Sequence, residues 1–160
     1  MAMTRAQKIA AATAAASALA LPFEGMRQVA YYDPPGILSV CAGHTGPDVV
    51  KNKTYTLAEC RGLLDKDMTT AVTAVDRCVP NAPDSVLLAF SDAAYNIGPK
   101  VACDTHNSTA ARLLKAGDWK GACRQLPRWD KSSVMGVMVA LPGLTRRRAA
   151  ESQICLKGLP

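Results

Sequence analysis

Three side chains that could act on a glycosidic bond fall within sixteen residues of this 160-residue chain. Glu24 is followed nine residues later by Asp33, and six residues after that by the hydroxyl of Ser39. Glycoside hydrolysis needs one carboxylic acid to protonate the leaving oxygen and, in most enzymes, a second carboxylate as base or nucleophile. The spacing indicates such a site, with Glu24 as acid, Asp33 as base and Ser39 holding the attacking water.

Each of these residues also has an ordinary structural explanation. Glu24 could be a surface charge, Asp33 a turn residue before Pro34, and Ser39 a polar position in a strand. The apolar neighbours of Glu24 favour the protonated state that an acid requires, whereas Asp33 beside a turn should stay solvated and ionised. The combination of all three in one short segment favours the catalytic interpretation.

Two strands and a long helix are expected to position these residues. Residues 28–33 and 37–41 predict a hairpin that turns at Pro34-Pro35-Gly36. Thr56 and Glu59 have the spacing of a capping box, and apolar residues then recur at helical spacing as far as Cys78. This pattern predicts a helix of about twenty residues, long enough to bridge two lobes.

The remainder of the chain reads as shorter helices without a repeat or a linker. They are predicted over residues 86–96, 108–116, 119–126, around 135–139, and over 144–157. A small strand-containing N-terminal part followed by helices is an α+β fold.

Charge and composition restrict the class of protein only loosely. The net charge of +6 indicates an acidic partner, which could be nucleic acid, an anionic membrane or a polyanionic wall polymer, or it could simply favour solubility. No basic patch interleaved with aromatic residues is present, so we do not expect nucleic-acid binding.

The six cysteines indicate an oxidising compartment. None of them forms a C-x-x-C pair, which argues against a zinc ribbon or a thioredoxin-type site. Cys41 and His44 have ligand-like spacing, but no second pair matches them, so no metal site is expected. Three disulfides outside the cytoplasm explain the cysteines better.

The N-terminus has the features of an export signal. After Arg5 and Lys8, residues 9–23 carry no charge and are mostly alanine. They include the Ala-x-Ala sites Ala16-Ser17-Ala18 and Ala18-Leu19-Ala20. As a helix this stretch would span about 22 Å, less than the roughly 30 Å of a bilayer core. Cleavage would leave Glu24 beside a frayed terminus, so an uncleaved segment is expected. The alternative is an ordinary alanine-rich soluble helix.

Several motifs together resemble one enzyme family. They are Phe23-Glu24-Gly25, Tyr31-Tyr32-Asp33, Ser39 to Gly46, Ala94 to Gly98, and Gly143 to Arg148 with Glu151 and Cys155. Over about residues 20–158 the chain resembles the phage lysozymes, glycoside hydrolase family 24. The resemblance implies a lysozyme-like fold, in which a small N-terminal β-hairpin lobe and a larger helical lobe are joined by a long helix. It also implies hydrolysis of the β-1,4 bond between N-acetylmuramic acid and N-acetylglucosamine in peptidoglycan, without a cofactor.

The same resemblance assigns roles to individual residues. The catalytic Glu, Asp and Thr of the family fall on Glu24, Asp33 and Ser39, and Ser39 departs from the family by keeping the hydroxyl without the methyl that restricts its rotamer. His44 is expected to pair with a carboxylate of the long helix, Asp67, in a structural role. The cysteines are expected to pair as Cys41–Cys60, Cys78–Cys103 and Cys123–Cys155.

The N-terminus resembles the signal-arrest-release segment of some endolysins. Residues 1–23 would then form the anchor and residues 24–160 the catalytic domain. The resemblance implies a monomer that is inactive while residues 9–23 lie in the host inner membrane. After release the enzyme would act in the periplasm, together with a holin-type lysis partner. Tethering so close to Glu24 should keep the cleft from assembling.

Two other functions are compatible with these features. A lytic transglycosylase on a similar scaffold uses one Glu and closes an anhydro ring, so Asp33 favours hydrolysis instead. A non-catalytic secreted wall-binding domain could use the same basic charge and disulfides.

Overall fold

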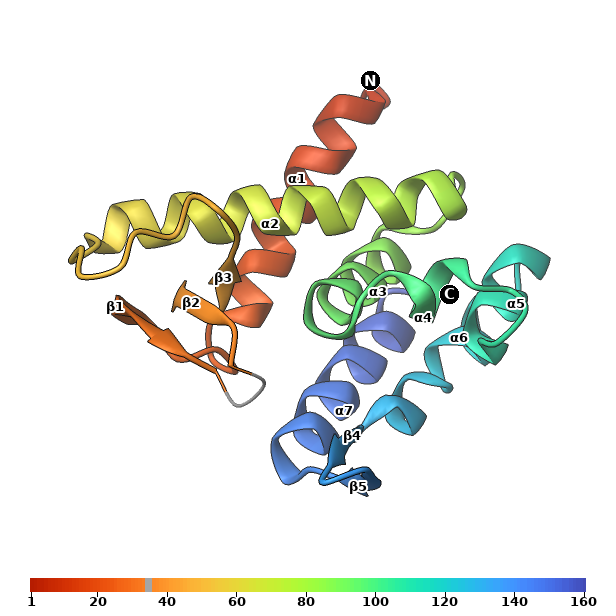
Figure 1. Ribbon diagram of the computed structural model, residues 1–160. Helices are drawn as coiled ribbons and strands as arrows, with labels where there is room; N and C mark the ends of the chain where they lie inside the picture. The colour runs from red at the N-terminus through yellow and green to blue at the C-terminus, as the bar shows by residue number, and fades with distance from the viewer. Residues whose placement is uncertain (34–35) are drawn as a thin grey trace.

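The computed structural model describes residues 1–33 and 36–160, which form two lobes joined by one long helix (Figure 1). Helices and small antiparallel sheets make up the chain, so the predicted α+β class is confirmed. Pro34 and Pro35, the first two residues of the predicted Pro34-Pro35-Gly36 turn, lie outside the described residues.

The small lobe is a three-stranded antiparallel sheet in the order β1-β2-β3. Its strands are β1 (Arg27–Tyr32), β2 (Leu38–Cys41) and β3 (His44–Thr45), and the two strands predicted from sequence are confirmed. The fully enclosed core of this lobe is small and consists of Val40, Cys41, Tyr55 and Cys60. The lobe therefore depends on its attachment to the helix that follows, to which the Cys41–Cys60 disulfide fastens it.

The bridge between the lobes is α2 (Leu57–Cys78), which confirms the predicted long helix. Thr56 accepts from the backbone N–H of Glu59, and the Glu59 side chain accepts from the backbone N–H of Thr56, which completes the predicted capping box. Apolar residues at helical spacing bury one face of α2 against the other helices.

The helical lobe surrounds α3 (Asp84–Ile97), whose apolar faces pack against α1, α2 and α7. Around it lie α4 (Lys100–Cys103), α5 (Thr109–Ala116), α6 (Trp119–Cys123), the 3-10 helix η1 (Leu126–Trp129) and α7 (Pro142–Lys157). Disulfides Cys78–Cys103 and Cys123–Cys155 join these elements, so all three pairings implied by the family resemblance are confirmed.

The alanine-rich N-terminal stretch forms α1 (Arg5–Ala20), which packs against both α2 and α3 (Figure 1). Ala12, Ala16 and Ala20 are buried in the main core, where their small side chains allow the helices to approach closely. On the same helix, the Ser17 hydroxyl donates to Asp65 Oδ1 on α2 over 2.7 Å. In this structure the segment is part of the helical lobe.

No helix within residues 1–33 and 36–160 is both long enough and apolar enough to cross a membrane.

A hairpin replaces the helix predicted around residues 135–139, so that prediction was wrong. Strands β4 (Lys131–Val134) and β5 (Val137–Ala140) pair antiparallel across a turn at Met135 and Gly136. Both turn residues have positive φ, 50° and 81°, as a two-residue hairpin turn of the favoured twist requires. The glycine and the valine-rich flanks were the signal for a turn between strands.

Candidate active site

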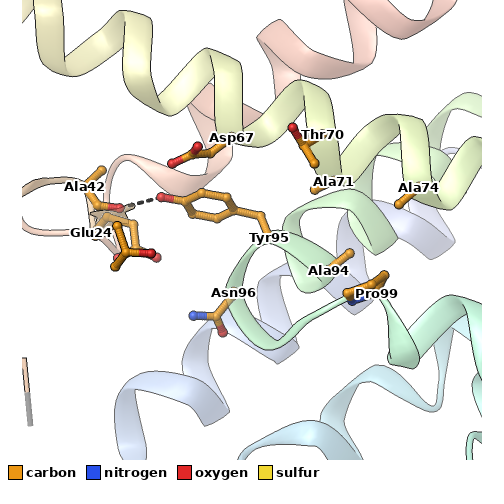
Figure 2. Close-up of a pocket in the computed structure, with 12 residues that line it drawn as sticks. Glu24, Ala42, Asp67, Thr70, Ala71, Ala74, Ala94, Tyr95, Asn96 and Pro99 are labelled. Atoms are coloured by element: carbon orange, nitrogen blue, oxygen red, sulfur yellow. Dashed lines mark hydrogen bonds between the residues drawn. The ribbon is translucent and has the colours of Figure 1, made fainter. Parts of the chain in front are cut away.

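A hollow of about 440 Å³ lies between the two lobes. The small lobe and the segment before it contribute Glu24, Ala42, Gly43 and Thr45, and α2 contributes Asp67 (Figure 2). The floor continues along α2 and onto the end of α3, with lining residues Thr70, Ala71, Ala74, Ala94, Tyr95, Asn96 and Pro99. Of the residues predicted from sequence, Glu24 and Asp67 line this cleft, whereas Asp33 and Ser39 lie outside its described lining.

Glu24 is placed by the end of α1. Its backbone N–H donates to the carbonyl of Ala20 over 3.1 Å, so the chain turns directly from the helix into the cleft. The Glu24 side chain is 22% exposed, enough to reach a substrate while most of it is enclosed. Gly43 has a φ of 80°, and a Cβ at this position would lie 3.9 Å from Glu24 Oε2, so the β2–β3 turn passes close to the carboxylate.

A buried arginine orients the Glu24 carboxylate. Arg147 Nη1 on α7 donates to Glu24 Oε1 over 2.5 Å. Its other two nitrogens, Nε and Nη2, each donate to one carboxylate oxygen of Asp92 over 2.9 Å. Because this two-pronged pair fixes the guanidinium plane, the direction of the contact to Glu24 is fixed as well.

Arg147 forms ion pairs with two carboxylates at once. Burial disfavours the charge of Arg147, but its hydrogen bonds and proximity to Asp92 and Glu24 raise its pKa above the ordinary value. Glu24 shares this cation with Asp92, so the Glu24 carboxylate has a charged group beside it in the cleft. The neighbours of Glu24 in the sequence suggested apolar surroundings, but the folded structure places a buried ion pair beside it.

The arginine run at residues 146–148 divides between interior and surface. Arg147 and Arg148 are buried and paired, and Arg148 binds Glu151, which is also fully buried. Burial raises the pKa of Glu151 and lowers that of Arg148. Arg146, in contrast, is exposed.

Asp33 and Ser39 are brought together by the β1–β2 pairing, in which Tyr31 lies opposite Ser39. Asp33 Oδ1 accepts from the backbone N–H of Ile37 over 2.7 Å. The Ser39 hydroxyl is 3.4 Å from Asp33 Oδ2 and 3.3 Å from the carbonyl oxygen of Ile37. These long distances indicate weak hydrogen bonds, and Ser39 is only 1% exposed.

His44 connects the small lobe to α2. Its Nδ1 is 2.7 Å from Asp67, the partner predicted from the family resemblance, and its Nε2 is 3.1 Å from Asp48. Burial disfavours the imidazolium, but the hydrogen bonds to the two carboxylates outweigh it and raise the pKa of His44. Within the described residues, no three Cys, His, Asp or Glu side chains converge as they would to bind a metal ion.

A tyrosine bridges the two sides of the cleft. Tyr95 extends from α3 and donates its hydroxyl to the carbonyl of Ala42 in the β2–β3 turn (Figure 2). Burial, with Glu24 and Asp67 nearby, raises the pKa of the Tyr95 hydroxyl, so it remains a donor. Tyr95 stood in a motif of the family resemblance, but the spacing along the chain gave no sign of this contact.

The chain is similar to known phage proteins in both sequence and structure. The family model described as phage lysozyme matches residues 22–151. This chain belongs to the phage lysozyme family. A protein named "SAR-endolysin" from Bacteriophage PS119 is 39% identical over 136 residues, covering 84% of this chain and 77% of that protein. This phage lysozyme is accordingly a glycoside hydrolase that cleaves peptidoglycan, as the sequence predicted.

Two solved structures of one phage enzyme differ in their similarity to this lysozyme. The active form of the P1 phage endolysin Lyz has a TM-score of 0.77 at 27% identity, covering 91% of this chain and 85% of that chain. The secreted inactive form has a TM-score of 0.52 at 24% identity, covering 72% and 78%. The fold described here is therefore more similar to the arrangement called active.

Proposed function

We propose that this lysozyme hydrolyses the β-1,4 bond between N-acetylmuramic acid and N-acetylglucosamine, with Glu24 as the general acid. The observation that carries this assignment is the clamp of Asp92 and Arg147, which holds Glu24 at the cleft. In this assignment Glu24 gives its proton to the glycosidic oxygen as the bond to the anomeric carbon breaks. Water attacks that carbon and transfers a proton to Asp33, while Ser39 orients the water or the Asp33 carboxylate.

The acid and base assignments are tested with isosteric variants on purified peptidoglycan. Glu24→Gln is expected to abolish activity, since the amide cannot donate the required proton, and Asp33→Asn should lower kcat at least a hundredfold. Asp84→Asn, which changes a carboxylate 74% exposed and away from the cleft, serves as the matched control. Full activity of Glu24→Gln would overturn the assignment, and 1,6-anhydro ends in the products would favour the transglycosylase.

We also propose that residues 9–23 first hold the enzyme in the host inner membrane, and that it acts in the periplasm after release. A holin-type partner would trigger this release. The names of the relatives and the alanine-rich composition of α1 support the proposal. The backbone hydrogen bond from Glu24 to Ala20 adds a physical reason, because withdrawal of α1 into lipid removes the support that places the acid.

Testing the tether requires keeping α1, because deletion of residues 1–20 would remove Ala12, Ala16 and Ala20 from the core. Ala14 and Ala18 are exposed on α1, so leucine at both positions should strengthen membrane retention without disturbing the packed face. Glutamine at both positions is the control that keeps helix propensity.

The readout is the distribution of protein between membrane and periplasm, with activity measured in each fraction. The leucine variant should accumulate in the membrane without activity. Depolarisation should release the wild type more readily than the leucine variant. Membrane-bound enzyme that cuts peptidoglycan at the full rate would overturn the proposed control.

A further inference from the structure

The β4–β5 hairpin carries a continuous group of exposed apolar side chains. They are Val134, Met135, Val137, Met138 and Val139. Met135 at the turn is 99% exposed, and Val137 and Met138 are each 62% exposed. Single exposed hydrophobic residues are ordinary on a protein surface, but a contiguous apolar patch marks a contact with a protein or a membrane.

The apolar residues lie on both faces of the hairpin as well as at its tip. Val134 pairs with Val137, so their side chains share one face. Met138 pairs with Ser133, and its side chain points to the opposite face. A protein partner would cover one face and leave the other in water, whereas lipid surrounds an inserted tip on every side. The arrangement therefore favours a bilayer over a second copy of the chain.

The base of the hairpin is fastened to the helical lobe. The backbone N–H of Leu141 donates to the carbonyl of Asp130 over 3.0 Å, which closes the hairpin where its two strands meet the body of the protein. The hydroxyl of Thr145, in the first turn of α7, donates to Asp130 Oδ2 over 2.9 Å. The exposed tip is therefore presented by a fixed base.

Positive charge surrounds this base. Lys131 opens β4, Arg128 precedes it in η1 and Arg146 follows in α7, and all three are exposed. Between residues 128 and 146 the sequence contains one carboxylate, that of Asp130. An apolar tip above a ring of cations is complementary to a membrane whose headgroups carry negative charge.

The dimensions of the hairpin fit an interfacial position. Lys131 lies three residues before Val134, which at the rise of an antiparallel strand is about 10 Å. Insertion of the tip by roughly 5–10 Å reaches the boundary between headgroups and acyl chains and leaves Lys131 at headgroup depth. Deeper insertion is unfavourable, because the outer edges of a two-stranded sheet carry backbone groups that hydrocarbon cannot satisfy.

We propose that the tip of the β4–β5 hairpin inserts into the anionic phospholipid surface of the host inner membrane and holds the released enzyme there. The inference rests on the proposed release, which leaves the folded enzyme beside that membrane. The hairpin lies at the opposite end of the molecule from the N-terminal end of α1 (Figure 1). Contact through the hairpin therefore leaves α1 packed in the core and the cleft assembled, unlike the proposed tethered state.

The experiment is co-sedimentation of the full-length protein with vesicles of phosphatidylethanolamine and phosphatidylglycerol, and with neutral vesicles of phosphatidylcholine. Val137→Thr combined with Met138→Thr keeps the β propensity of β5 and should weaken binding to the anionic vesicles about tenfold. Lys131→Gln should weaken binding to the anionic vesicles about fivefold and leave binding to the neutral vesicles unchanged. Both variants should cleave purified peptidoglycan at the wild-type rate, which also shows that they are folded.

Val29→Thr combined with Val50→Thr is the matched control. These valines are 51% and 53% exposed, but they lie on the small lobe rather than on the hairpin. The control should bind both kinds of vesicle as the wild type does. Equal weakening in the two double variants would mean that exposed apolar surface in general attracts lipid, and would overturn the proposal.

Two further results would overturn it. One is a hairpin variant that binds as tightly as the wild type, as expected if α1 alone contacts the vesicles, or a wild type that does not bind. The other is self-association of the wild type without vesicles, measured by analytical ultracentrifugation and lost in the hairpin variant, which would assign the hairpin to a contact between copies. A wild type that binds vesicles but leaves peptidoglycan intact would instead contradict the proposed function.

Discussion

The two carboxylates proposed as acid and base are held in opposite ways. Glu24 is oriented by Arg147, which is 3% exposed and fixed by the fully buried Asp92. Asp33 lies on a hairpin, where its contact to Ser39 is 3.4 Å long and the enclosed core of the lobe is small. The proposed acid therefore belongs to the lobe with the larger core, and the proposed base to the softer lobe with the smaller core. In the proposed mechanism, closure of the small lobe would bring the base and its water to a sugar already positioned against the acid.

Breaking the clamp on the acid should have the largest effect. Arg147→Met leaves Asp92 buried without its partner, which is expected to lower the free energy of unfolding by about 3–5 kcal/mol and to abolish activity. Urea unfolding and a peptidoglycan assay measure both quantities. Arg61→Met is the surface control, and a stable, active Arg147→Met variant would remove the basis of the comparison.

The disulfide of the softer lobe should come next. Replacing both Cys41 and Cys60 with alanine is expected to lower the free energy of unfolding by about 2–4 kcal/mol, with loss of activity because the β-sheet loses its link to α2. The same change at Cys78 and Cys103 should leave more activity for a similar loss of stability, since the larger core supports that lobe. Equal activity losses in the two pairs would contradict the contrast between lobes.

The contact of His44 with Asp67 and Asp48 should make the attachment of the small lobe depend on pH. The pKa of His44 is raised in the folded protein, so its stabilising contribution is complete below the ordinary pKa of about 6.5 and is lost as pH rises through the raised value. Urea unfolding at pH 6 and pH 9 should show a larger loss for wild type than for His44→Gln. Identical losses would show that this contact does not stabilise the lobe differently at the two pH values.

Restoring the methyl group at Ser39 should have the smallest effect. Ser39→Thr restricts the side-chain rotamer, and the entropy saved is expected to raise kcat about twofold. Ser39→Ala should lower kcat, because no hydroxyl remains to orient water or Asp33. Steady-state kinetics on peptidoglycan distinguish the two, and a faster Ser39→Ala variant would exclude a role for the hydroxyl.

Local signals predicted most of the fold. The capping box at Thr56 and the apolar spacing after it involve only residues close together in the sequence, so the sequence alone predicted α2. The β4–β5 hairpin was missed because its valines and methionines fit either a short helix or a strand. Met135 has a positive φ in the folded turn. Residues other than glycine rarely adopt this conformation, so the residue type at position 135 did not predict it.

The parts of the site that could not be predicted all join distant segments. Arg147 lies 123 positions from Glu24, and Tyr95 lies 53 positions from Ala42. Such contacts depend on how α3 and α7 pack, which periodicity does not determine. The family resemblance supplied the pairing of His44 with Asp67, and no spacing rule would have chosen it.

The small residues of α1 restrict how this sequence can diverge over generations. Ala12, Ala16 and Ala20 lie where α1 packs against α2 and α3, and a larger side chain there would force the helices apart. Mutations that add hydrophobicity are therefore tolerated only at the outward-facing positions of the helix. If the proposed membrane-held state exists, selection on the packing of the folded enzyme also limits how strongly the N-terminal segment can partition into lipid. The same alanines would then have to suit both the protein core and the bilayer.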